Sequence, residues 1–181
     1  MKLLILSDIH ANVSALTAVL EAVQAHGYPV DRVVLLGDHI DYGMRPNETI
    51  QILQQLPYPI DVNIWGNHEK AIFDFDTDGH RFASQRGREF SLLTAQMLDG
   101  DAKQYILHMD KTGKAERQYD GKRYLFVHGS LEDVFWKAIF PGRETADAYA
   151  DYDVVVSGHP HRPHYFERYY PADNPAMRNK K

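Results

Sequence analysis

The sequence predicts an α/β fold organised around a largely parallel β-sheet. Short apolar segments that each end in a polar turn alternate with amphipathic helical patterns. Strands and helices that alternate over short connections are typical of βαβ units, in which a helix joins two parallel strands. The chain has 181 residues, enough to bury the core of one domain.

The first strand is expected at residues 3–6, a continuous apolar run of the kind found in strands buried on both faces. Asn12 is expected to cap the helix that follows, and Gly27 to end it. The second strand is expected within residues 32–38. Pro46 then suits the first turn of another helix, and residues 60–69 contain the third strand and a glycine turn.

The second half of the chain is less regular. Residues 70–104 are expected to be mostly helical, with a polar loop around residues 76–79. Asp120-Gly121 lies between two extended runs and predicts a β-hairpin. A further strand is expected at residues 152–156, and a last short one extending to about Tyr170.

Composition narrows the class of protein. Residues 1–170 are expected to form a single domain, and residues 171–181 a loop or frayed tail. No apolar run approaches the roughly 18 residues of a membrane span, so no membrane partner is expected. The chain contains no cysteine, which suits a cytoplasmic location, and its net charge of -5 argues against general nucleic-acid binding.

Residues able to bind metals follow five of the expected strands. They are Asp8 and His10, Asp38 and Asp41, Asn67 and His68, His128, and His159 and His161. The carboxyl ends of strands in an open α/β sheet are where ligands bind, so these side chains are expected to converge. Carboxylate, imidazole and amide donors without sulfur favour Mn, Fe, Zn, Ni or Co.

The histidine pair at residues 159 and 161 has a spacing suited to metal binding. Two residues apart in an extended chain, both side chains lie on the same face, and Asp8 and His10 share this spacing. Pro160 lowers the entropy lost in holding the pair. A single aspartate or histidine at such a place is more often a helix cap or a structural residue, but five compatible clusters together predict a metal centre.

The motifs resemble those of the calcineurin-like metallophosphoesterases. They are DIH (8–10), GDHIDYG (37–43), GNHE (66–69), VHGS (127–130) and GHPH (158–161). The segment GDHIDYGMRPNE (37–48) is similar to the small bacterial branch of YfcE-like phosphodiesterases and diadenosine polyphosphate hydrolases. The resemblance implies a central β-sheet sandwich flanked by helices in αββα layers. The closing C-terminal strands of relatives are not recognisable in this chain.

The resemblance also implies a role for each motif residue. Asp8, His10 and His161 would bind one metal ion, with Asp38 bridging to a second ion. Asn67, His128 and His159 would complete the second site. Two divalent ions, manganese as first choice, would lie about 3.5–4 Å apart and activate a bridging hydroxide. His68, aligned by Asp41, would stabilise the transition state or protonate the leaving oxygen.

The function implied is hydrolysis of phosphomonoesters or phosphodiesters, dinucleoside polyphosphates among them. Tyr42, Arg45 and Lys70 are candidate contacts to this small-molecule substrate. One alternative is a phosphoprotein (Ser/Thr) phosphatase, although Tyr42 stands where those enzymes carry an arginine. Another is a non-catalytic protein-binding scaffold of the same fold, which would not need stoichiometric metal. Self-association remains open, because a sheet edge without its closing strands would be bare.

Overall fold

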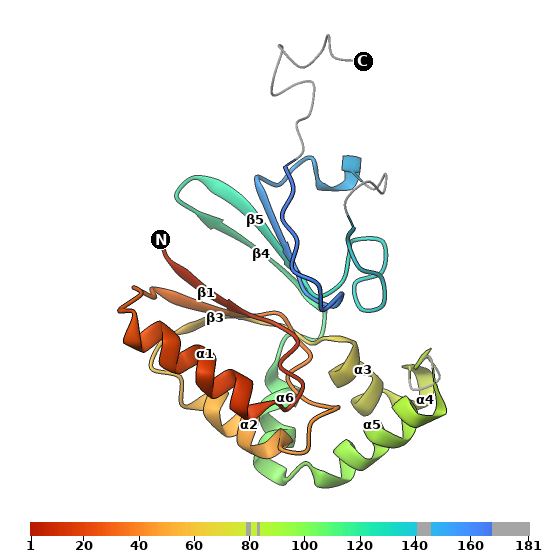
Figure 1. The fold of residues 1–181 in the computed structure, drawn as a ribbon. Helices are drawn as coiled ribbons and strands as arrows, with labels where there is room; N and C mark the ends of the chain where they lie inside the picture. The colour runs from red at the N-terminus through yellow and green to blue at the C-terminus, as the bar shows by residue number, and fades with distance from the viewer. Residues whose placement is uncertain (79–80, 83, 141–145, 168–181) are drawn as a thin grey trace.

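The structure, a computed structural model, describes residues 1–78, 81–82, 84–140 and 146–167. Two three-stranded sheets pack face to face, and helices cover one side of the pair (Figure 1). The elements are β1 (Leu3–Leu6), α1 (Val13–Ala25), β2 (Arg32–Leu35), α2 (Pro46–Gln54), β3 (Ile60–Asn63), α3 (Asn67–Phe73), α4 (Phe75–Asp78), α5 (Gln85–Met97), α6 (Gly100–His108), β4 (Lys114–Tyr119), β5 (Lys122–Val127), the 3₁₀ helix η2 (Ala146–Tyr149) and β6 (Val154–Ser157).

The first sheet has the order β1-β2-β3, and its strands are all parallel, as the sequence predicts. Helices α1 and α2 are the crossovers between them. Asn12 caps α1 as expected, because its side-chain oxygen accepts a hydrogen bond from the Ala15 backbone N–H at 3.1 Å. Parallel strands place all three carboxyl ends at one edge of this sheet.

The second sheet has the order β4-β5-β6. Strands β4 and β5 form the predicted antiparallel hairpin around Asp120-Gly121, where both residues have positive φ. Strand β6 runs parallel to β5, with Val127 beside Ser157. The carboxyl ends of β5 and β6 are therefore adjacent.

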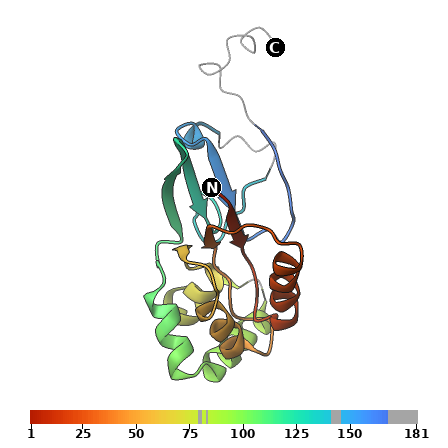
Figure 2. The same ribbon diagram turned by 90° about the vertical axis from the view of Figure 1, so that its left-hand side faces the viewer.

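Apolar side chains form the contacts between layers. One cluster joins the helix side of the first sheet to α1, α2 and α6, with Leu35, Ile50 and Ile106 at its centre. A second cluster, which includes Val34 and Phe126, fills the space between the two sheets. Figure 2 shows the same stacking from the side, with the helices against the first sheet and the second sheet beyond it.

The outer face of the second sheet has a thinner cover. Leu125 and Val127 pack there against Tyr149 of η2 and against the loop that follows β5.

Within the described ranges, no helix is both long and apolar enough to cross a membrane.

Two local expectations are wrong. The loop expected around residues 76–79 is helical from Phe75 to Asp78, as α4. Residues 162–167 form no strand, although one was expected to extend to about Tyr170. Pro163 lacks the N–H that a central strand would donate, and Tyr165 is 84% exposed instead of packing on a sheet. The remainder of that expected strand and the expected tail, 171–181, lie outside the described residues.

The two sheets are joined by polar contacts along the edge formed by β3 and β4. The Asp61 carboxylate accepts hydrogen bonds from the Tyr119 hydroxyl at 2.5 Å and from the Arg117 Nε at 3.1 Å. Burial alone would raise the pKa of Asp61, but the hydrogen bonds from Tyr119 and Arg117 outweigh it and lower that pKa. Asp61 in its charged form therefore stabilises the contact between the sheets.

We expect Asp61→Asn to lower the free energy of unfolding at pH 7 by about 1 kcal/mol, since the hydrogen bonds to a partly exposed charge are lost. Because the folded pKa is depressed, the contribution is present above the ordinary value of 3.8 and is lost as the pH falls through the folded pKa. Urea unfolding of the unaltered protein and of Asp61→Asn should give free energies of unfolding that differ at pH 7, and the difference should narrow below about pH 4. The exposed Asp151→Asn is the control, and a difference independent of pH would contradict this role.

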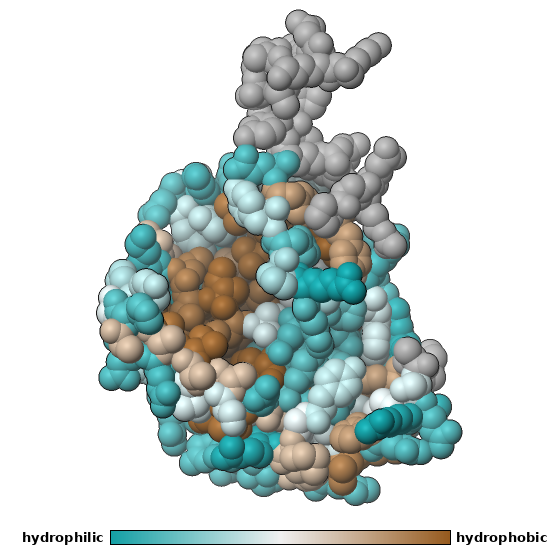
Figure 3. Space-filling view, in the orientation of Figure 1, coloured by the Kyte–Doolittle hydropathy of each residue, from teal (hydrophilic) through white to brown (hydrophobic). Residues whose placement is uncertain are grey.

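The opposite edge of the sandwich is open. Leu3 and Val156 belong to the cluster between the sheets, and their neighbours Ile5 and Val154 extend the same apolar surface toward solvent. Ile5 is 37% exposed. Figure 3 shows an apolar hollow on this flank, between β1 and the second sheet. Among the described strands, none pairs with the outer side of β1 or β6.

Candidate metal centre

Five turns converge where the two sheets meet, each at the carboxyl end of a strand. Backbone hydrogen bonds tie neighbouring turns together, from Asp8 N to Gly37 O at 3.1 Å and from Gly158 N to His128 O at 2.9 Å. The turn after β6 is also fixed to the turn after β1, because the His159 N–H donates to the Asp8 carboxylate at 3.0 Å. Residues separated by 151 positions are thus adjacent.

The turns have an unusual backbone conformation. Of the non-glycine residues with positive φ in the described part of the chain, all but Asp120 lie in these turns. They are Asp8, His10, Ala11, Asp38, Asp41, Tyr42, His159 and His161. This left-handed region is disfavoured for residues with a Cβ, and such residues cluster at functional sites.

Glycines allow the turns after β2 and β3 to approach closely. A Cβ on Gly37, whose φ is +87°, would strike the backbone of Gly66. A Cβ on Gly66 would strike the Asp38 side chain in return. The Gly-Asp and Gly-Asn sequences at these two strand ends therefore have a steric reason.

Two groups of donor atoms form at the convergence. The first donor group consists of Asp8, His10, Asp38 and His161, and the second consists of Asp38, His128 and His159. Within each group the ligand atoms lie within 4.8 Å of one another. Asp38 belongs to both groups, as a bridging ligand would.

In the first donor group, imidazole nitrogens face each other and a carboxylate. The Nε2 atoms of His10 and His161 are 3.0 Å apart, and His161 Nε2 is 3.3 Å from Asp8 Oδ1. His10 Nε2 also lies 3.8 Å from Asp38 Oδ2. The group is accessible from one side, because His161 is exposed and His10 is buried.

The second donor group includes a side-chain amide as well. The Asn67 Oδ1 atom lies 2.9 Å from His128 Nε2 and 2.9 Å from His159 Nδ1. His128 Nε2 is 3.2 Å from Asp38 Oδ2. Asn67 thereby joins this group, so all seven predicted ligand residues lie in one or other of the two groups.

Backbone carbonyls orient two of the rings. The Nδ1 atom of His10 lies 3.2 Å from Ile40 O, and that of His128 lies 2.7 Å from Leu36 O. Carbonyl oxygens only accept, so each Nδ1 carries a proton, and each Nε2 is turned toward the donor group. This arrangement is common for histidines that bind metals.

The Asp38 carboxylate is the observation that best tests whether cations fit here. Its Oδ1 accepts the His68 backbone N–H at 2.9 Å, while the fully buried Oδ2 has no hydrogen-bond partner among the described residues. Burial alone would raise the pKa of Asp38, but the nearby His128 and His68 lower it, so the carboxylate is charged. A buried charge is costly unless it is paired or binds a cation, so the donor set fits divalent metal ions.

His68 lies beside the donor groups and is held by Asp41. Its Nδ1 donates to Asp41 Oδ2 at 2.7 Å, and its ring is 4.8 Å from the His10 ring. Burial alone would lower the pKa of His68, but the charge of Asp38 and the hydrogen bond to Asp41 outweigh it and raise that pKa. His68 can thus carry and transfer a proton at the edge of the site.

The three residues proposed for substrate contact lie in different surroundings. Tyr42 is near the centre, with its ring 4.7 Å from the His10 ring and 4.6 Å from the His68 ring. Arg45 forms an ion pair with Glu48. Lys70 Nζ lies 2.9 Å from Asp74 and 3.3 Å from Asp78, so both cations have acidic partners in this structure.

Some residues that support the site were missed in the sequence. Ser91 and Thr94 of α5 donate to the Asp41 carboxylate at 2.5 and 3.1 Å. Burial alone would raise the pKa of Asp41, and the hydrogen bonds from His68 and Ser91 lower it. The signal was two hydroxyl residues three positions apart on the buried face of an amphipathic helix, but nothing local identifies their partner.

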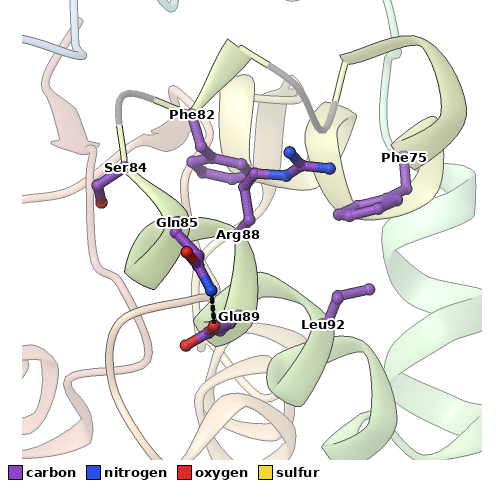
Figure 4. A pocket seen from close by; sticks show the side chains of 7 residues that line it. All are labelled: Phe75, Phe82, Ser84, Gln85, Arg88, Glu89 and Leu92. Atoms are coloured by element: carbon purple, nitrogen blue, oxygen red, sulfur yellow. Dashed lines mark hydrogen bonds between the residues drawn. The ribbon is translucent and has the colours of Figure 1, made fainter.

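Phe82 was missed as well. Its ring lies 5.3 Å from the His68 ring and also lines a hollow of about 520 Å³. Figure 4 shows this hollow, with Phe82 and Phe75 on either side of the Arg88 guanidinium and Leu92 below. Phe82 thus contacts His68 and also lines this surface hollow.

The fold and the donors together define an α/β protein with a candidate centre for two metal ions. The sequence model of the family described as calcineurin-like phosphoesterase matches residues 1–179. The chain therefore belongs to that family, and the predicted fold is confirmed.

Several known proteins are similar to this chain. A metallophosphoesterase of Sphaerobacter thermophilus is 32% identical in sequence, with a TM-score of 0.61 over 89% of this chain and 61% of its own. An uncharacterized protein of Methanocaldococcus jannaschii is 26% identical over 161 residues, which are 88% of this chain and 62% of that protein. A hypothetical protein of Pyrococcus horikoshii OT3 shares the fold at 21% identity, with a TM-score of 0.70 over 88% of this chain and 69% of its own. The chain thus spans about three fifths of the length of the first two relatives.

Proposed function

We propose that the protein is a dinuclear metal-dependent phosphoesterase that hydrolyses phosphomonoesters or phosphodiesters. The observation that carries the proposal is the Asp38 carboxylate, which belongs to both donor groups and keeps one buried oxygen without a hydrogen bond. A shared carboxylate between two sets of nitrogen and oxygen donors suits a pair of divalent ions. Membership of the calcineurin-like phosphoesterase family supports the same reaction class.

The proposed ligands follow the two donor groups. Asp8, His10 and His161 would bind one ion, His128, His159 and Asn67 the other, and Asp38 both. Such ions would act as Lewis acids on phosphoryl oxygens and lower the pKa of coordinated water. Manganese is the preferred metal, with Fe, Zn, Ni and Co as alternatives for this donor set.

His68 and Asp41 are proposed to handle the proton. The Asp41 carboxylate holds Nδ1–H of His68, which leaves Nε2 as the atom able to donate to a leaving oxygen. Ser91 fixes Asp41 in turn, so the histidine ring has one preferred orientation. Tyr42, about half exposed beside His68, is proposed to contact the ester, whereas Arg45 and Lys70 would first have to leave their acidic partners.

The physiological ester is proposed only as a class. Dinucleoside polyphosphates and other small phosphate esters are included in it, and a cytoplasmic location is proposed from the absence of cysteine. We also propose that residues 1–170 form a single domain.

Metal removal tests the function directly. We expect the purified chain to bind close to two manganese ions and to hydrolyse bis(p-nitrophenyl) phosphate. Chelation followed by desalting should abolish the activity, and added Mn²⁺ should restore it, because the ligands remain in place. Elemental analysis and release of p-nitrophenolate are the two measurements. Persistent hydrolysis in the stripped protein would end the two-metal proposal, and a folded protein that binds no metal would favour the scaffold alternative.

A further inference from the structure

The Glu69 carboxylate is buried, and among the described residues no lysine or arginine side chain donates a hydrogen bond to it. The residue has 0% exposure. All of its described hydrogen bonds come from backbone N–H groups. They come from Asp38 at 2.8 Å, His39 at 2.7 Å, Gly66 at 2.8 Å and Ile40 at 3.4 Å.

Part of this pattern is an ordinary helix cap. Glu69 is the third residue of α3, and its Oε2 accepts from the N-cap Gly66, as in a capping box. In a capping box the side chain of the third helical residue accepts only that one bond, and glutamine serves as well as glutamate there. The donors at residues 38–40 lie about 30 positions away in the sequence and belong to a different turn.

The two oxygens divide the donors between the turns. Oε2 accepts from both Asp38 and Gly66, and so joins the turn after β2 to the turn after β3. Oε1 accepts from His39, and more weakly from Ile40. Successive N–H groups that converge on one anion form a nest, which is a favourable site for a carboxylate.

We infer that Glu69 is a positioning residue that sets the placement of the two donor groups relative to each other. Asp38, the ligand shared by both groups, belongs to the turn after β2, one of the two turns that Glu69 joins. Asn67, which belongs to the second group, follows directly after the other. The inference rests on the proposed metal centre and adds a residue that touches neither the ions nor the substrate.

Glu69→Gln removes half of this nest. With the amide oxygen in place of Oε2, the bonds from Gly66 and Asp38 can remain. The amide N–H₂ in place of Oε1 cannot accept, so the His39 and Ile40 N–H groups of the turn after β2 lose their acceptor and face a second donor. We expect the variant to fold and to bind Mn²⁺ about 10- to 100-fold more weakly by calorimetry, as for residues that orient metal ligands. Asp61→Asn is the matched control, because it also removes a carboxylate that bonds two elements, away from the centre, and its manganese affinity should be unchanged.

A second measurement guards against a variant that fails to fold. In the unaltered, manganese-loaded chain, amide hydrogen exchange should be strongly protected at Asp38 and His39, which no strand pairing accounts for. Unchanged manganese affinity in a folded Glu69→Gln, or rapid exchange at both amides, would overturn the inference. Neither readout needs hydrolysis, so a chain that binds manganese but cleaves no ester would refute the proposed function and leave this inference standing.

Discussion

Replacing Asp38 with asparagine is expected to weaken the binding of both metal ions and to reduce phosphodiester hydrolysis by more than about 100-fold, the upper end of the effect of residues that merely support a ligand. The substitution keeps the shape of the side chain and removes its charge. Oδ2 is the buried oxygen that lies near His128 and His10 of the two donor groups. Elemental analysis of the dialysed variant and its turnover number give the result.

A comparison with His161→Ala makes this prediction specific. His161 belongs only to the first donor group, so its loss should weaken the binding of one ion. The affinity for the other ion should stay near that of the unaltered protein. Asp41→Asn, which alters a buried aspartate outside both groups, should retain both ions. If Asp38→Asn binds two ions as tightly as the unaltered chain, the bridging role is wrong.

The second large effect is expected for His68→Ala. General acid catalysis contributes about 10²- to 10⁴-fold, and it matters most when the leaving oxygen is basic. We therefore expect hydrolysis of an alkyl ester to fall within that range. Hydrolysis of a p-nitrophenyl ester should fall far less, because p-nitrophenolate leaves without a proton. Steady-state kinetics with the two esters, at equal metal content, measure the difference.

His26→Ala is a suitable control, since His26 is exposed at the end of α1 and remote from the centre. An equal loss on both esters would remove His68 from proton transfer and leave it an electrostatic role. A loss of bound metal would instead show that the ring supports the ligands that surround it.

Most of the fold was predictable because its signals are local. The three parallel strands, the cap at Asn12 and the hairpin at Asp120-Gly121 each depend on a few consecutive residues. The donor residues were predictable for a similar reason, since each follows a strand, and parallel strands end at the same edge. An extended run forms a strand only where another strand pairs with it, and the sequence signals this pairing less clearly. Residues 162–167 were expected to belong to a strand and form none.

The supporting contacts were harder to predict. Ser91 and Thr94 meet Asp41 across 50 and 53 positions, and their partner depends on how α5 packs. Glu69 is recognisable as a helix cap from its sequence, but its bonds to the turn at Asp38 depend on the close approach that Gly37 and Gly66 allow. Such contacts follow from tertiary packing, and a single sequence does not encode them in a local pattern.

The left-handed backbone of the site turns has a consequence for attempts to make the protein more heat-tolerant. Each such residue costs on the order of 1–3 kcal/mol, so Ala11→Gly, at a buried position with φ 53°, offers an easy gain in melting temperature. A selection for thermal tolerance alone would find such relaxing changes first. The selected variants would then be more stable to heat but hold the ligand residues less rigidly. A useful screen must therefore select for turnover as well as for thermal stability.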